Sequence, residues 1–127
     1  MGDQPTKIRI LVAEDDLANQ RVAELFLTRL GFEVVIAQNG EEAVRLAQKA
    51  PCALIIMDCQ MPVMDGFEAT RRIRASGIEV PIIAMTANFG VRDRERCLEV
   101  GMNDFVSKPV DFRLLTEALE KWIHRGC

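Results

Sequence analysis

The 127-residue sequence has few of the residues that build zinc sites or disulfide-stapled domains. It contains no tyrosine, one histidine and four cysteines, and no two of the cysteines form a CxxC pair. This pattern argues against a zinc finger and against a secreted disulfide scaffold. We therefore expect reduced thiols in a cytoplasmic protein.

Long apolar runs and an excess of basic charge are also missing. The longest uninterrupted apolar run, Cys52–Met57, is far shorter than the roughly 18 residues that a membrane helix requires. The 16 Lys and Arg residues are outnumbered by 19 Asp and Glu, which gives a net charge of −3. Because a nucleic-acid footprint needs a basic excess, we expect no direct contact with nucleic acid or with a membrane.

A hydrophobic share of 49% is ample for a core in a chain of this length. We expect one domain over residues 1–127, with its core at about residues 7–125. Short apolar runs alternate with segments of helical periodicity throughout. The expected strands are Ile8–Ala13, Glu33–Ala37, Ala53–Asp58, Val80–Met85 and Asp104–Ser107. The expected helices are Leu17–Leu30, Asn39 to before Pro51, Asp65 to about Ala75, Val91–Val100, and Asp111 to about Arg125.

The central strands are continuously apolar, which is typical of a parallel sheet covered by helices on both faces. The sequence therefore predicts an α/β fold with an open, doubly wound parallel sheet. Ligands in such folds bind beyond the carboxyl ends of the strands. Polar residues follow these ends: Glu14, Asp15 and Asp16, then Asp58, Thr86 and Lys108.

Asp58 stands seven positions before Asp65, the expected helix cap, and so caps no helix itself. Carboxylates gathered in one crevice repel one another unless positive charge lies between them. A hard divalent cation such as Mg²⁺, together with Lys108, would supply that charge. A carboxylate, a metal, a lysine and a hydroxyl are the groups that phosphoryl transfer uses, so we interpret Asp58 as the nucleophile.

These motifs resemble the response-regulator receiver domain of two-component signalling, from about Lys7 to Arg125. The residues that carry the resemblance are Glu14-Asp15, Asn19-Gln20, the run Met57-Asp58-Cys59-Gln60-Met61-Pro62-Val63-Met64-Asp65-Gly66, Thr86-Ala87 and Lys108-Pro109. The chain is most similar to receivers fused to hybrid sensor histidine kinases, and we expect it to be part of such a polypeptide. The resemblance implies a five-stranded (βα)5 fold with the flavodoxin-like strand order 2-1-3-4-5.

The resemblance implies that Asp58 accepts a phosphoryl group from a histidine kinase or a histidine phosphotransfer domain. Such a domain is a phosphoacceptor that assists its own phosphorylation and slow dephosphorylation, and is not counted as an enzyme. The implied Mg²⁺ ligands are Glu14 through a water, Asp15, Asp58 and the backbone carbonyl of Cys59. The implied phosphoryl ligands are Thr86, Ala87 and Lys108.

Switching in this family couples Thr86 to an aromatic residue three positions before Lys108, where Phe105 stands without a hydroxyl group. The resemblance also implies a cis peptide at Lys108-Pro109. The output surface would be the fourth helix, fifth strand and fifth helix. On the last helix, Leu114 and Ala118 predict an apolar rim that could serve a homodimer.

Three alternatives remain at this point. A degenerate receiver would bind partners without phosphorylation, although no position of the pocket is missing. A haloacid-dehalogenase-like phosphatase needs a second Asp two positions after the nucleophile, where Gln60 stands. A flavodoxin-like electron carrier is disfavoured because Glu14-Asp15-Asp16 would repel the phosphate of the flavin.

Overall fold

The computed structural model describes residues 8–87 and 90–124, in which five strands and five helices alternate. The strands are β1 (Arg9–Ala13), β2 (Glu33–Ala37), β3 (Leu54–Asp58), β4 (Ile82–Thr86) and β5 (Asp104–Ser107). The helices are α1 (Leu17–Arg29), α2 (Gly40–Lys49), α3 (Gly66–Ala75), α4 (Val91–Val100) and α5 (Phe112–His124).

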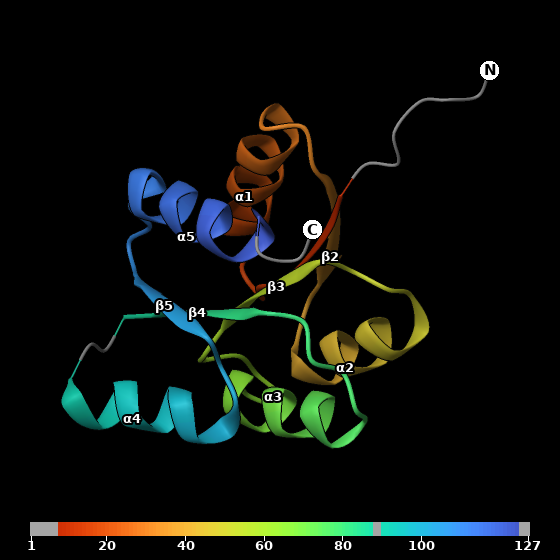
Figure 1. Ribbon diagram of the computed structural model, residues 1–127, viewed down its shortest axis with the longest axis vertical. Coiled ribbons are helices and arrows are strands. Elements are labelled where there is room, and N and C mark those ends of the chain that lie inside the picture. The colour runs from red at the N-terminus through yellow and green to blue at the C-terminus, as the bar shows by residue number, and fades with distance from the viewer. Residues whose placement is uncertain (1–7, 88–89, 125–127) are drawn as a thin grey trace.

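All neighbouring strands pair in parallel, in the order β2-β1-β3-β4-β5. Helices α1 and α5 cover one face of the sheet, and α2, α3 and α4 cover the other (Figure 1). This arrangement confirms the predicted doubly wound α/β fold. It also brings the ends of β1, β3, β4 and β5 to one edge of the sheet.

Alternate side chains of the central strands enter two separate cores, because successive residues of a strand point to opposite faces. The core under α2–α4 includes Leu11, Ala13, Ile55, Met57 and Ala84. The core under α1 and α5 includes Ile10, Val12, Leu54, Ile56 and Ile83. Burial on both faces explains why these strands lack polar alternation.

Strand β4 begins later in the structure than the sequence predicts. Its expected range began at Val80, whereas the observed strand is Ile82–Thr86. Proline has no N–H to give to a ladder, and Pro81 contributes only its carbonyl oxygen, which accepts a hydrogen bond from Ile55 N at 2.9 Å. The strand also ends one residue later than predicted, at Thr86.

The predicted apolar rim on α5 needs a correction. Ala118 is 7% exposed and belongs to the core with Leu119, so only Leu114, at 44%, remains at the surface. Phe112, which shares the helical spacing of the buried Leu115 and Leu119, is nevertheless 37% exposed, and its ring centroid lies 4.6 Å from that of Phe26. Helical spacing alone does not distinguish the buried Ala118 from the exposed Leu114, because the twist of the sheet determines how much of α5 lies against it.

Arg74 links α3, β4 and α4 at the edge of the sheet opposite the carboxyl ends of the strands. Its guanidinium donates to the carbonyl oxygens of Gly101 (2.8 and 3.0 Å), Ile78 (3.0 Å) and Val80 (2.8 Å), and to Asn103 Oδ1 (2.8 Å). Gly101, with φ of 107°, ends α4 in the left-handed region that glycine adopts readily. One side chain thus ties α3 to β4 and to the end of α4.

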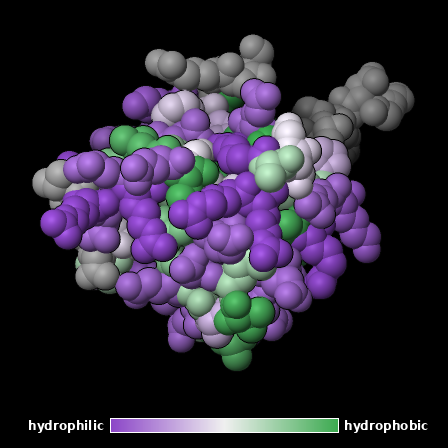
Figure 2. Space-filling model, turned by 90° about the horizontal axis from the view of Figure 1, so that it is seen from below, coloured by the Kyte–Doolittle hydropathy of each residue, from purple (hydrophilic) through white to green (hydrophobic). Residues whose placement is uncertain are grey.

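Seen from the side of α2, α3 and α4, the surface is mainly hydrophilic, with hydrophobic side chains gathered in small patches (Figure 2). These helices therefore turn their apolar sides to the sheet, as amphipathic surface helices do. None of the described helices combines the length and the apolar character needed to cross a membrane.

Candidate functional site

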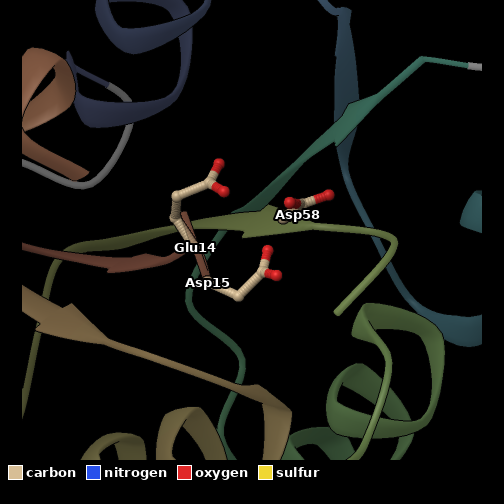
Figure 3. Close-up of side chains that lie close together, drawn as sticks. All are labelled: Glu14, Asp15 and Asp58. Carbon is tan, nitrogen blue, oxygen red and sulfur yellow. The ribbon is translucent and has the colours of Figure 1, made fainter. Parts of the chain in front are cut away.

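Three carboxylates meet where β1 and β3 end. Glu14 and Asp15 directly follow β1, and Asp58 is the last residue of β3 (Figure 3). One oxygen of each carboxylate lies within 4.8 Å of the others. Because the carboxyl ends of parallel strands share one edge, the predicted crevice brings Asp58 together with acidic residues that lie 43 and 44 positions before it in the sequence.

Lys108, after β5, supplies positive charge to this cluster. Its Nζ lies 2.7 Å from Asp58 Oδ2 and 3.4 Å from Glu14 Oε1. The Lys108-Pro109 peptide is cis, as the resemblance implied, and Lys108 N–H donates to the carbonyl of Thr86 at 2.8 Å. Burial lowers the pKa of Lys108, but its hydrogen bonds and charge interactions with Asp58 and Glu14 outweigh that effect and raise it. The lysine is therefore a cation at neutral pH.

Burial acts in the opposite direction on the glutamate. Glu14 is 5% exposed and Asp58 is 3% exposed. Burial raises the pKa of Glu14, and the negative charge of Asp58 adds to this, while the Asp16 N–H and Lys108 oppose it. Three carboxylates against one ammonium leave the crevice with an excess of negative charge, which a divalent cation would balance.

The donor set fits magnesium. All three side chains offer oxygen, and Mg²⁺ is commonly held by one or two carboxylates together with water and phosphate oxygens. The Cys59 carbonyl, a further implied ligand, accepts a hydrogen bond from Gly66 N at 3.1 Å and retains a second lone pair. Burial, the neighbouring Cys97 and Asp58 raise the pKa of the Cys59 thiol, so only its backbone suits a hard cation.

The loop after β3 holds Asp58 through the backbone. Gln60 N–H donates to Asp58 Oδ1 at 3.0 Å, a local contact that the sequence pattern does not predict. Asp65 caps α3 as predicted, accepting from Glu68 N at 2.9 Å. A Cβ at Gly66 would collide with the backbone carbonyl oxygen of Asp58, so glycine allows α3 to begin directly against the acidic residue.

The tip of the same loop is a γ-turn centred on Val63. Met64 N–H donates to the Pro62 carbonyl at 2.7 Å, and Val63 has φ of 70° and is 77% exposed. A positive φ is costly for a β-branched residue. The Met64 carbonyl in turn accepts from Gly40 N at 3.1 Å, which ties the turn to the start of α2. No pattern in the sequence signals this turn.

Thr86 ends β4 on the side of the sheet that faces α4. It is 6% exposed, and Ala87 after it is exposed. The register pairs Thr86 with Ser107 and Ala84 with Phe105, so Thr86 and Phe105 point to the same face, two positions apart. The guanidinium of Arg94 lies 5.2 Å from the centre of the Phe105 ring. Coupling between Thr86 and Phe105 stays a prediction.

Comparison with known proteins identifies the family. The model of the response regulator receiver domain matches residues 10–120. The chain belongs to this family. The receiver is 45% identical over 123 residues to the hybrid signal transduction protein dokA of Dictyostelium discoideum, covering 94% of this chain and 7% of that protein. The chain spans a similarly small share, 6%, of the hybrid signal transduction histidine kinase B of the same organism.

Solved structures agree with this assignment. The receiver domain of sensor histidine kinase PA1611 from Pseudomonas aeruginosa PAO1, with a magnesium ion coordinated in its active-site cleft, is 45% identical with a TM-score of 0.86, covering 94% of this chain and 99% of that one. The receiver domain of Saccharomyces cerevisiae Ssk1, co-crystallised with the histidine phosphotransfer protein Ypd1, is 34% identical with a TM-score of 0.86, covering 91% and 88%. This chain is thus a receiver domain of two-component systems with an acidic pocket suited to magnesium.

Proposed function

We propose that this receiver domain takes a phosphoryl group from a phosphohistidine of a partner protein onto Asp58, with Mg²⁺ bound beside it. The observation that carries the proposal is the contact of 2.7 Å between Lys108 Nζ and Asp58 Oδ2, inside the cluster of Glu14, Asp15 and Asp58. A buried carboxylate held by a lysine beside two further acids is suited to phosphoryl transfer and unsuited to helix capping.

In the proposed step, a carboxylate oxygen of Asp58 attacks phosphorus as the P–N bond of the phosphohistidine breaks. The imidazole nitrogen keeps the electron pair of that bond, and an acyl phosphate forms on Asp58. Bound Mg²⁺ would supply positive charge that offsets the charge of the phosphoryl oxygens. Glu14, Asp15, Asp58 and the Cys59 carbonyl are the residues that would hold it.

Three groups at the ends of β4 and β5 would receive the phosphoryl oxygens. Lys108 offers a charged donor that already lies against Asp58, and the Thr86 hydroxyl offers a second donor from the neighbouring strand end. The Ala87 N–H would offer the third, beside a small side chain that leaves the approach open. Catalysis of this kind depends on positioned charge and hydrogen bonds, and needs no further base.

The partner in this proposal is a histidine kinase or a histidine phosphotransfer domain. Support comes from the receiver of Ssk1, whose structure was solved with such a phosphotransfer protein. We further propose that the domain is a phosphoacceptor that assists its own phosphorylation and slow dephosphorylation, and that phosphorylation alters the surface of α4, β5 and α5. A homodimer through that surface stays a prediction, with Leu114 as its apolar contact.

Intact mass spectrometry after incubation with Mg²⁺ and acetyl phosphate tests the proposal. We expect one added phosphoryl group, absent from Asp58→Asn and from a sample with excess chelator. The Asp16→Asn variant, which changes charge beside the cluster and leaves its three carboxylates in place, is expected to accept the group. A folded wild-type protein that gains no mass from acetyl phosphate or from a phosphorylated phosphotransfer protein would favour the degenerate receiver.

A further inference from the structure

The side chain of Gln20 on α1 forms a hydrogen bond that links the helix to the acidic cluster. Gln20 Nε2 donates to the backbone carbonyl oxygen of Glu14 at 2.7 Å. Strand β1 ends at Ala13, while Glu14 N–H still donates to the Ala37 carbonyl at 2.9 Å. Gln20 therefore holds the first carbonyl group that lies beyond β1.

That carbonyl belongs to the peptide unit between Glu14 and Asp15. Rotating this unit turns the Glu14 oxygen and changes ψ of Glu14 and φ of Asp15 together. The direction of the Asp15 Cα–Cβ bond depends on these two angles, since the planar peptide leaves no other soft rotation between the backbones of the two residues. A donor fixed to the Glu14 oxygen thus restrains the direction in which the Asp15 side chain leaves the backbone.

Three further hydrogen bonds join the residues on either side of Asp15. Asp16 N–H donates to Glu14 Oε2 at 3.1 Å, and Asn19 N–H donates to Asp16 Oδ2 at 2.9 Å. Gln20 N–H donates to the Asp16 carbonyl at 2.9 Å, so Gln20 contacts the loop through both its backbone and its side chain. The contact from Gln20 Nε2 restrains the peptide plane before Asp15, and the Asp16 N–H restrains the plane after it.

We propose that Gln20 is a positioning residue that orients Glu14 and Asp15 for binding a divalent cation. The inference rests on the proposed function only for the identity of the cation, and its test is a binding measurement. Residues that orient metal ligands from outside the coordination shell commonly change metal affinity 10–100-fold when they are replaced.

Isothermal titration of the full chain with MgCl₂ tests this role. Gln20→Met keeps the length of the side chain and removes its donor, and we expect the Mg²⁺ Kd to rise about tenfold. Gln20→Leu, a second variant that lacks the donor and adds no charge, is expected to weaken binding too. Gln38→Met, the same change at an exposed glutamine, serves as the control and is expected to stay within about twofold of wild type.

A second readout separates positioning from loss of fold. At saturating Mg²⁺, Gln20→Met is expected to reach the wild-type extent of phosphorylation, because only the affinity is impaired. Wild-type affinity in both folded Gln20 variants, or no Mg²⁺ binding by the wild-type chain, would overturn the inference. Normal Mg²⁺ binding with a tenfold loss in Gln20→Met, but no phosphorylation of any variant, would refute the proposed function and leave the role of Gln20 standing.

Discussion

Replacing Asp15 by Asn tests the electrostatics of the acidic cluster. Asp15 lies within 4.8 Å of both Glu14 and Asp58, measured between carboxylate oxygens. Two unit charges at that separation repel by about 1 kcal/mol in bulk water and by about 3.5 kcal/mol at an effective dielectric constant of about 20. Because Asp15 is exposed, the lower figure applies. We expect Asp15→Asn to raise the free energy of unfolding by about 1–2 kcal/mol without metal at low salt.

Urea denaturation followed by far-ultraviolet circular dichroism, in chelator and then in MgCl₂, measures this effect. Bound Mg²⁺ would stabilise the wild type by about 2.7 kcal/mol at 100 times its Kd, whereas Asp15→Asn lacks one of the proposed ligands and should gain less. The order of stability should therefore reverse with Mg²⁺. Asp16→Asn is the matched control, because asparagine caps a helix as well as aspartate does. Equal stabilisation by both variants, or destabilisation by Asp15→Asn in chelator, would refute the reasoning.

Three other predictions use denaturation in chelator. Arg74→Met should lower the free energy of unfolding by about 2–4 kcal/mol, because it leaves several acceptors unpaired. The control Arg72→Met, on the exposed face of α3, should lower it by at most about 0.5 kcal/mol. Equal losses in the two variants would contradict a stabilising role for the hydrogen bonds of Arg74. Val63→Gly should stabilise the protein by about 1 kcal/mol by relieving the positive φ, and a loss of stability would show that the turn is unstrained. Burial raises the pKa of Glu14, so its charged form lowers the free energy of unfolding as the pH rises above 4.5. Glu14→Gln should therefore be more stable than wild type at neutral pH, and this difference in the free energy of unfolding should shrink on acidification toward pH 4.5. A difference that does not change with pH would contradict the raised pKa of Glu14.

The sequence is a good guide to the elements because the central strands carry continuous apolar runs and capping residues mark the starts of several helices. Asn39 and Asp65 cap α2 and α3 as predicted. Helical spacing is a weaker guide to the buried face. On α1 the apolar residues Val22 and Leu25 repeat at helical spacing, yet these side chains are half exposed and Leu27 is fully buried, because the spacing alone does not show which side of the helix lies against the sheet.

The cluster of Glu14, Asp58 and Lys108 could be predicted because strand ends meet wherever parallel strands share a sheet. Hydrogen bonds made through the backbone could not. The contact from Gln20 to the Glu14 carbonyl depends on the path of the loop between β1 and α1. The turn at Val63 depends in the same way on the position of α2, which its neighbour Met64 contacts. Such features arise from packing between elements and leave no local pattern.

The measurement that tests the central claim most directly locates the phosphoryl group. The chain is phosphorylated in the presence of Mg²⁺, treated with borohydride to reduce the acyl phosphate, and digested for peptide mass spectrometry. Reduction converts a phosphorylated aspartate to homoserine, and we expect this change at Asp58 alone, dependent on Mg²⁺. Conversion at Asp15 or Asp16 with Asp58 unchanged, or no conversion in a folded protein that binds Mg²⁺, would contradict the account.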